Sequence, residues 1–326
     1  MQEEFEKILF HALHHNISDI HIIRKRNCVV YFRKSGQLEK YTTIEYDRGV
    51  KLITYIRFLS KIDLNYQWKP QTGNYVWMEN EHPYYLRISS LPSSETDSIV
   101  IRILNNHAVL DINTISYFSD TREFLMDIAN RRHGLFIVSG ATGSGKSTTL
   151  YTLLDTINKI SNRSIITLED PVEVVKEYCL QIQMNDGMGI TYQDTLKQVL
   201  RHDPDVIMIG EIRDKSTAKL AINCALTGHL VLTTLHAGSC LTTIQRMLHL
   251  EVSTLDVKEI LVGILNQSMV FKAKDNNPII LSEFMDGTQI KEYLEASTSN
   301  YTSYDIHAKQ LVEDNIVSID EVKGYL

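Results

Sequence analysis

A glycine-rich octapeptide is the segment of this sequence with the clearest chemistry. Residues 140–147 read Gly-Ala-Thr-Gly-Ser-Gly-Lys-Ser and match the pattern G-x-x-x-x-G-K-[ST] at every defined position. An apolar run, Leu135–Ser139, precedes it and a helical pattern, Thr148–Ile157, follows it, which is the context in which this motif binds phosphate. Glycines let successive backbone N–H groups point at one phosphate, and the dipole of the following helix favours the same anion.

We therefore predict that this loop binds ATP together with Mg²⁺. Lys146 would bridge oxygens of the β- and γ-phosphates, and the hydroxyl of Ser147 would ligate the Mg²⁺ ion. A glycine loop that only turns the chain is the alternative, and the flanking strand and helix patterns argue against it. The predicted nucleotide-binding residues are Gly140, Ala141, Thr142, Gly143, Ser144, Gly145, Lys146, Ser147 and Thr148.

Acidic residues follow two other predicted strands. The apolar run Val206–Ile209 leads through a glycine to Glu211, and the run Ser164–Leu168 leads to a second set, Glu169, Asp170 and Glu173. Ligands of α/β proteins bind outside the carboxyl ends of parallel strands, so we predict that Glu211 supports Mg²⁺. Asp205 stands at the other end of its strand and is interpreted as a polar residue of the strand start. Each acid of the second set could by itself be a solvated loop residue.

Two histidines flank the predicted strand Leu230–Thr234. His229 comes directly before the strand, and His236 follows it. A single histidine is more often an ordinary core residue than a catalytic one, but a pair around a strand next to Glu211 favours nucleotide sensing or charge stabilisation. The remaining histidines that we considered keep the ordinary structural interpretation: His14, His15, His202 and His249.

A parallel sheet is needed to bring these groups together. From Arg122 onward, short β-branched runs alternate with helical patterns, which predicts an α/β domain with a mainly parallel sheet. We expect this domain to cover residues 121–326, with a helical subdomain at its C-terminal end. Residues 105–120 have no clear periodicity and are predicted to form a linker.

Residues 1–104 predict a smaller N-terminal α/β domain. Hydrophobic periodicity indicates an opening helix around Phe5–Leu13 and a second helix at Asp47–Leu59. Alternating or β-branched runs predict five strands, at Asp19–Ile23, Cys28–Phe32, Asn74–Met78, Tyr84–Ser89 and Ser98–Leu104.

Composition excludes several classes of protein. The chain has 326 residues with a net charge of −7, and its Lys and Arg residues are dispersed, so direct binding of nucleic acid is disfavoured. The four cysteines form no C-x-x-C pair and are predicted to be free thiols. The acidic, polar start does not resemble a secretory signal, and no apolar run reaches the length of a membrane span. We expect a cytoplasmic protein.

Four linked motifs resemble those of the secretion ATPases of type II secretion, type IV pili and DNA-uptake systems. They are the phosphate loop, an acidic box at Thr167–Glu173, a strand ending in Glu at Ile207–Glu211, and a His box at Thr227–His236. The resemblance extends over roughly residues 15–265, since signatures of the family's N-terminal domain also occur, at Ser18–His21, Pro70–Gly73, Leu86–Ser89 and Ile101–Ile103.

The resemblance implies a C-terminal RecA-like P-loop domain and an N-terminal PAS-like domain. It further implies a homohexamer in which the N-terminal domain of one subunit packs on the RecA-like domain of the next. By the same resemblance, Glu173 is the base that activates water, Glu211 supports Mg²⁺ and water, and Arg87 and Arg102 reach the γ-phosphate of a neighbour's ATP in trans. The alternative for the two arginines is that they are surface charges of strands.

The sequence differs in several features from those of large members of the family. This sequence shows neither their extra N-terminal domain nor their four-cysteine metal knuckle, and it reads Asn266-Gln267-Ser268-Met269-Val270 where a Gln-Arg-Leu stretch is frequent. In this it resembles the compact ATPases of competence pseudopili in Gram-positive bacteria, and also the equally compact retraction ATPases.

We therefore expect an ATPase on the cytoplasmic face of the cell membrane. It would power assembly of a competence pseudopilus for DNA uptake and act on an inner-membrane platform protein of that pseudopilus. The alternatives are a motor that retracts the filament, a hexameric nucleic-acid helicase or translocase, and a nucleotide-gated scaffold with little turnover.

Overall fold

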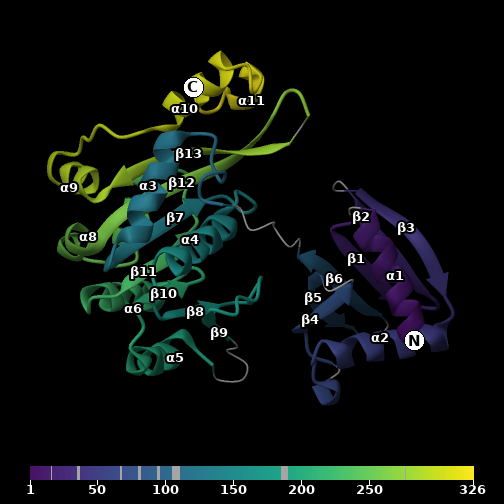
Figure 1. Ribbon diagram of the computed structural model, residues 1–326. Coiled ribbons are helices and arrows are strands. Elements are labelled where there is room, and N and C mark those ends of the chain that lie inside the picture. Colours follow the sequence, from purple (N-terminus) through teal and green to yellow (C-terminus); the bar gives the residue numbers. More distant parts are fainter. Residues whose placement is uncertain are drawn as a thin grey trace. The chain divides into compact units, whose positions relative to one another are not determined.

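The structure is a computed structural model that describes residues 1–15, 17–34, 37–66, 68–79, 82–93, 96–104, 111–184, 190–275 and 277–326. The chain divides into two compact units, Met1–His107 and Ala108–Leu326 (Figure 1). Each unit has its own sheet and its own buried apolar cluster. Part of the predicted linker, residues 105–110, lies outside the described residues, and helix α3 (Ser119–Asn130) begins within its last two positions.

The N-terminal unit is an antiparallel sheet packed against two helices. Its strand order is β3-β2-β1-β6-β5-β4. Phe5 of α1 and Leu52 of α2 share one buried cluster with Ile20 and Ile22 of β1, so alternate residues of β1 face the helices. The elements are α1 (Gln2–His14), β1 (Asp19–Arg24), β2 (Cys28–Lys34), β3 (Gln37–Ile44), α2 (Tyr46–Leu59), a 3-10 turn (Leu64–Tyr66), β4 (Gln71–Glu79), β5 (His82–Pro92) and β6 (Asp97–Leu104).

The C-terminal unit contains a seven-stranded sheet of order β13-β12-β7-β11-β10-β8-β9. All neighbouring pairs are parallel except β12 with β13. The mainly parallel sheet that the sequence predicted is therefore confirmed. Its strands are β7 (Gly134–Gly140), β8 (Ile165–Glu169), β9 (Cys179–Gln183), β10 (Val206–Ile209), β11 (Leu230–Leu235), β12 (Leu261–Phe271) and β13 (Pro278–Asp286).

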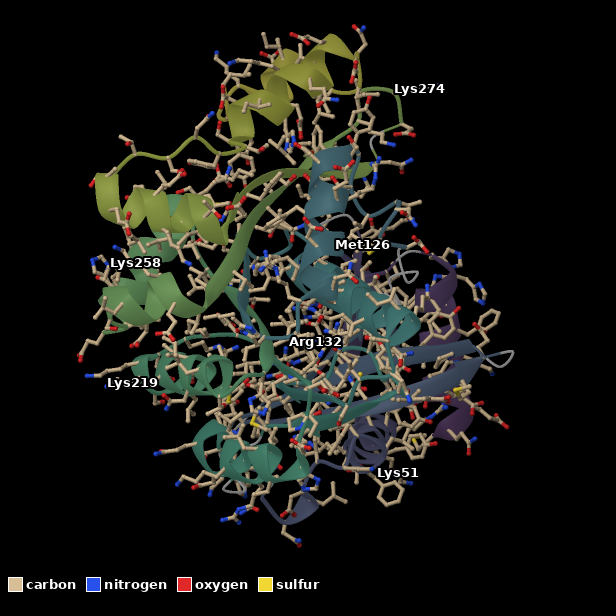
Figure 2. The ribbon with its side chains drawn as sticks, turned by 60° about the vertical axis from the view of Figure 1, so that its left-hand side comes forward. Lys51, Met126, Arg132, Lys219, Lys258 and Lys274 are labelled. Carbon is tan, nitrogen blue, oxygen red and sulfur yellow. The ribbon has the colours of Figure 1, made fainter. Side chains whose placement is uncertain are left out.

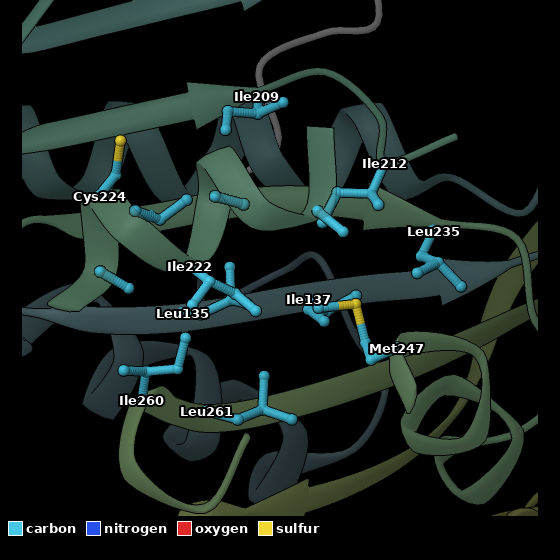
Figure 3. Packing of buried hydrophobic residues seen from close by; sticks show 14 of the residues in the cluster. Leu135, Ile137, Ile209, Ile212, Ile222, Cys224, Leu235, Met247, Ile260 and Leu261 are labelled. Atoms are coloured by element: carbon cyan, nitrogen blue, oxygen red, sulfur yellow. The ribbon is translucent and has the colours of Figure 1, made fainter. Parts of the chain in front are cut away.

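Helices cover both faces of this sheet. Phe136 and Val138 of β7 pack with α3 and α4 on one face, whereas Leu135 and Ile137 pack with α5 to α8 on the other. Figure 3 shows the second face, where Met247 of α7 lies near Ile137. These helices are α4 (Lys146–Ile160), α5 (Tyr192–Val199), α6 (Lys215–Leu226), α7 (Cys240–His249) and α8 (Thr254–Ile260), and a 3-10 turn covers Leu200–His202.

The C-terminal part contains more β structure than the predicted helical subdomain. Strands β12 and β13 extend the sheet before the helices α9 (Gly287–Ala296), α10 (Tyr304–Glu313) and α11 (Ile319–Val322). The prediction missed β12 because Asn266, Gln267 and Ser268 interrupt its apolar pattern. The first two of these side chains are buried nevertheless, because they bond to other polar groups of the core.

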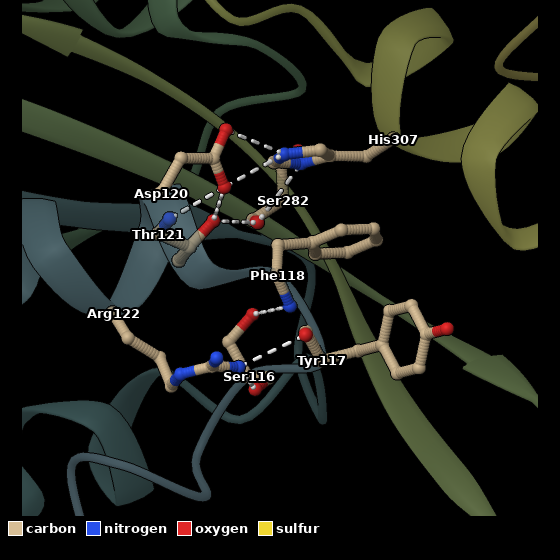
Figure 4. Close-up of polar contacts among 8 residues, drawn as sticks. All are labelled: Ser116, Tyr117, Phe118, Asp120, Thr121, Arg122, Ser282 and His307. Atoms are coloured by element: carbon tan, nitrogen blue, oxygen red, sulfur yellow. Dashed lines mark hydrogen bonds and ion pairs between the residues drawn. The ribbon is translucent and has the colours of Figure 1, made fainter.

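The beginning of α3 is fixed by the C-terminal helices (Figure 4). The ring of Phe118 stacks on that of His307 in α10, with ring centroids 3.7 Å apart. His307 Nε2 lies 3.0 Å from Asp120 Oδ2, and the hydroxyls of Thr121 and Ser282 are 3.0 Å apart. The first helix of the C-terminal unit is thus packed against nearly the last one.

The structure bears on two predictions made from composition, which concern the cysteines and membrane-spanning helices. All four cysteines are free thiols, and Cys28, Cys224 and Cys240 are buried. None of the helices that the structure describes combines the length and apolar character that a bilayer crossing requires.

Candidate nucleotide-binding site

The phosphate loop joins the end of β7 to the beginning of α4. The φ angles of Gly140, Gly143 and Gly145 are +144°, +82° and +91°, values that residues with a Cβ rarely adopt. A Cβ at Gly140 would also lie 2.3 Å from the carbonyl oxygen of Gln267. The glycines of the motif are therefore required by the backbone path, and the first also by packing.

The donors of the loop fit a bound triphosphate. The first N–H groups of α4 have no acceptor within the helix, and the hydroxyl of Ser144 is buried with no hydrogen-bond partner among the described residues. Lys146 Nζ donates to the carbonyl oxygens of Gly140 at 3.0 Å and Ala141 at 2.7 Å. Burial lowers the pKa of Lys146, while the charges of Glu211 and Glu173 act to raise it. A partly desolvated ammonium beside unpaired N–H groups is the donor set that phosphate oxygens require.

The backbone around Glu211 is held by both neighbouring strands. Gly210 N donates to Leu168 O of β8 at 2.8 Å, and Thr234 Oγ1 of β11 donates to Gly210 O at 2.6 Å. Glu211 therefore leaves the sheet at the same edge as the phosphate loop and the acids that follow β8, as the strand pattern predicted.

The carboxylate of Glu211 lies between two side chains. His236 Nε2 is 3.3 Å from its Oε1, and Arg213 Nε donates to its Oε2 at 3.0 Å. Arg213 Nη1 also lies 3.4 Å from Asp170 Oδ2, and the hydrogen bond from Arg213 to Glu211 raises the pKa of the guanidinium. Arg213 thus links the acids that follow β10 and β8. The sequence analysis missed it, although its place two residues after Glu211 was a usable signal.

The structure distinguishes the two glutamates at and after the end of β8. Glu169 is buried, and it accepts hydrogen bonds from Thr167 Oγ1 at 2.5 Å, Gln181 Nε2 at 3.1 Å and the hydroxyl of Tyr151. Burial raises its pKa. Glu173 is half-buried, and its carboxylate receives no hydrogen bond within the described part of the chain. Of the two glutamates, only Glu173 is left to act on a water molecule.

The two predicted histidines lie at opposite ends of β11. In the parallel register with β7, Leu230 pairs with Gly134 and Leu235 pairs with Ser139. His236 therefore follows the strand end that lies beside the phosphate loop. His229 precedes the other end, which is about six residues, or roughly 20 Å, away, and its Nδ1 lies 2.9 Å from Cys224 O. The predicted role at the nucleotide fits the geometry of His236 and not that of His229 in this unit.

Arg87 and Arg102 are direct cross-strand partners on β5 and β6 of the N-terminal unit. Arg102 is also opposite Asp19 of β1, and its Nε donates to Asp19 Oδ1 at 2.8 Å. Burial acts to raise the pKa of Asp19, but hydrogen bonds from Arg102 and Ser18 hold it below its usual value. The structure thus brings the two arginines together on one sheet face and anchors one of them to a buried carboxylate.

The stretch that departs from the family pattern lies against the phosphate loop. Gln267 Nε2 donates to Thr149 Oγ1 in α4 at 2.9 Å. Asn266 Nδ2 donates to Ser139 Oγ at 2.7 Å and to Ala237 O at 3.0 Å. These contacts could not be predicted, because two amides inside an apolar run match no motif.

The side chains near the loop fit a Mg²⁺ ion that also binds the nucleotide. Within the described ranges, no three His, Cys, Asp or Glu side chains are placed to hold a metal by themselves. Magnesium in nucleotide sites takes most of its ligands from phosphate and water, with one or two from protein. Ser147 in the first turn of α4 and Glu211 at the end of β10 are suitable contributors.

The chain is similar to several known proteins. A protein-family model described as "Type II/IV secretion system protein" matches residues 1–322. "Competence protein ComGA" of Bacillus subtilis (strain 168) is 41% identical over 254 residues, which are 78% of this chain and 71% of that protein. "Competence protein ComGA" of Halalkalibacterium halodurans is 34% identical over 319 residues, 92% of each chain.

The fold itself also has a solved counterpart. The structure titled "Crystal Structure of the Pilus Retraction Motor PilT and Bound ADP" superposes with a TM-score of 0.77 and 23% sequence identity. The superposition covers 98% of this chain and 96% of that chain. The likeness therefore concerns both units and their folds.

Proposed function

Because this chain belongs to the type II/IV secretion system protein family and is an ATPase, we propose that it powers assembly of a competence type IV pseudopilus for DNA uptake. The relatives named as competence proteins support this output. The observation that carries the proposal is the convergence of Lys146 and Glu211 at one sheet edge, where His236 and Arg213 flank the carboxylate.

In the proposed reaction, ATP and water give ADP and phosphate. The N–H groups of the loop and Lys146 hold the β- and γ-phosphates. Ser147 and Glu211 would hold Mg²⁺, which would supply positive charge to the phosphate oxygens. Glu173 accepts a proton from the water whose oxygen attacks the γ-phosphorus, and the bond from that phosphorus to the bridging oxygen of ADP breaks. The positive side chains stabilise charge that spreads over the transferred group.

We further propose that the working form is a homohexamer in which Arg87 and Arg102 act on a neighbour's ATP. Their adjacency on one face, and the anchoring of Arg102 by Asp19, support a paired guanidinium site for phosphate oxygens. Arginines supplied in this way can raise the rate by about 10³–10⁵.

Force from ATP hydrolysis is proposed to pass to a membrane platform protein at the cytoplasmic face of the cell membrane. A nucleic-acid motor is disfavoured by the net charge of −7. Basic side chains are also spread over separate elements, as the labelled lysines illustrate: Lys51 in α2, Lys219 in α6, Lys258 in α8 and Lys274 after β12 (Figure 2). A groove for nucleic acid requires clustered cations.

Deleting the gene tests the direction of the motor. We expect the deletion strain to lose surface filaments and DNA uptake. The wild-type gene should restore both, whereas genes for Lys146→Ala or Glu173→Gln should restore neither. Electron microscopy of filaments and transformation frequency are the measurements. Surplus filaments in the deletion strain would instead identify a retraction motor.

Mixed rings test whether Arg87 acts in trans. Arg87→Ala and Lys146→Ala subunits should each be inactive alone, and mixing them should restore part of the ATPase activity. The reason is that some interfaces then combine an intact Lys146 with an intact Arg87 from the neighbour. Lys146→Ala mixed with the Lys146→Ala/Arg87→Ala double variant is the control and should stay inactive. Failure to recover activity in rings shown to contain both single variants would contradict action in trans.

A further inference from the structure

We propose that Tyr151 and Asp155 are positioning residues that clamp the loop carrying Glu173 onto the helix of the phosphate loop. We name this segment, Asp170–Tyr178, the acidic loop; it connects β8 to β9. The inference rests on the proposed role of Glu173 as the base. It adds residues that no motif identified.

The two residues stand on one face of α4. They are four positions apart, which is about one helical turn, and both are buried, with 7% and 8% of their surface exposed. Since α4 begins with Lys146, the helix that presents the phosphate loop also presents this pair.

The hydroxyl of Tyr151 makes the first contact. It donates to Glu169 Oε2 and accepts a hydrogen bond from Val174 N at 3.3 Å. Glu169 is the last residue of β8, and Val174 directly follows Glu173. One hydroxyl therefore holds both ends of the segment Glu169–Val174, which contains the proposed base.

Asp155 makes the second contact, one turn further along the helix. Its Oδ2 accepts from Lys176 Nζ at 2.8 Å, and its Oδ1 accepts from the hydroxyl of Tyr178. The side chains of Lys176 and Asp155 are 9% and 10% exposed. An ion pair this deeply buried is costly to break, because it leaves an unpaired charge.

Gln181 of β9 also holds the acidic loop. Its Oε1 accepts from Lys176 N at 2.6 Å, and its Nε2 donates to Val174 O at 2.9 Å and Glu169 Oε1 at 3.1 Å. The backbone on the C-terminal side of Glu173 is thus fixed by a helix and by a strand.

The consequence is that Glu173 and the phosphate loop move as one body. The helix that binds the phosphates also sets the position of the base, so the distance between attacking water and γ-phosphorus does not depend on an independent loop. Misplacement of a reacting group by about 1 Å can cost about 10²-fold in rate. Tyr151 and Asp155 therefore act on turnover through Glu173, without contact to the nucleotide.

Tyr151→Phe in the assembled enzyme tests this clamp. The ring stays in the core while both hydrogen bonds of the hydroxyl are lost. We expect kcat to fall by roughly 10- to 100-fold, with KM for ATP and nucleotide affinity unchanged. Thr156→Val is the matched control, since its hydroxyl is buried on the same helix but donates to Thr152 O. It should keep kcat within about two-fold.

The double variant Tyr151→Phe/Glu173→Gln separates positioning from a general loss of packing. The effects of substitutions are non-additive when the residues act as a unit. The kcat of the double variant should therefore be no lower than that of Glu173→Gln alone. Gln181→Leu removes the hydrogen bonds from β9 to the acidic loop. By itself it should lower kcat, and in combination with Glu173→Gln it should lower kcat no further than Glu173→Gln does.

Three results would overturn the inference. A wild-type kcat in both Tyr151→Phe and Gln181→Leu would show that the clamp does not matter. Losses that multiply in the double variant would show that Tyr151 acts independently of the base. A wild-type rate in Glu173→Gln would show that Glu173 is not the base. This result is distinct from the first two, because the variant leaves Tyr151 unchanged.

Discussion

Lys146→Ala is expected to abolish steady-state ATP hydrolysis and to weaken nucleotide binding. In the proposed site its ammonium binds the phosphates. In the structure the ammonium donates to two carbonyl oxygens of the loop, and it can exchange these bonds for stronger ones to phosphate oxygens. Removing one hydrogen-bond donor to the charge that develops in the transition state lowers kcat by about 10²–10³. Loss of the positive charge of Lys146 lowers it further. Phosphate release and binding of a fluorescent ATP analogue are the measurements.

Lys159→Ala provides the matched control for this result. Lys159 is on the same helix, its side chain is 64% exposed, and its Nζ lies 3.9 Å from Asp111 Oδ2. Removing it changes the net charge equally without touching the loop, so the ATPase rate should stay at the wild-type value. Normal hydrolysis by Lys146→Ala would refute the assignment of the phosphate loop.

Glu173→Gln and Glu211→Gln are expected to bind ATP while turning it over far more slowly. A glutamine keeps the shape of either side chain but cannot take a proton, and a positioned general base contributes about 10²–10⁴ in rate. At Glu211, the amide oxygen can still accept from Arg213 Nε, so the local fold should persist while support for Mg²⁺ weakens. Nucleotide affinity and single-turnover rates separate the two effects.

Glu177→Gln is the control for these acid variants. Glu177 is an exposed residue of the same acidic loop, and its loss should leave kcat unchanged. If Glu173→Gln hydrolysed ATP at the wild-type rate, the base would have to be Glu169 or Glu211. The three protein donors that surround Glu169 make Glu211 the better candidate in that event.

Four strands with continuous apolar runs were predictable from the sequence, whereas β3 and β9 were missed. The four predicted strands of the C-terminal domain, found as β7, β8, β10 and β11, are wholly buried. In contrast, β3 is exposed along most of its length and β9 is only partly buried. β3 pairs with β2, which directly precedes it in the chain, and β9 pairs with β8. Hydrogen bonding to the neighbouring strand therefore forms these two strands, and local hydrophobicity does not record it.

Motifs located the site, but contacts between motifs could not be read from them. Spacing alone could not separate Glu169 from Glu173, because the difference is one of burial and hydrogen bonding. It likewise grouped His229 with His236, although a whole strand separates them. The link from Arg213 to Asp170 and the contact of Gln267 with Thr149 join segments distant in the chain, so only the structure shows them.

The packing of Phe118 and Asp120 on His307 has a consequence for biosynthesis. Asp120 and His307 are 187 residues apart in the chain, and Tyr304 of the same helix donates to Asn266 Oδ1, whose amide reaches Ser139 at the entry to the phosphate loop. A ribosome delivers α10 after Asp120, Ser139 and Asn266. The nascent ATPase unit therefore cannot complete its fold until α10 has emerged.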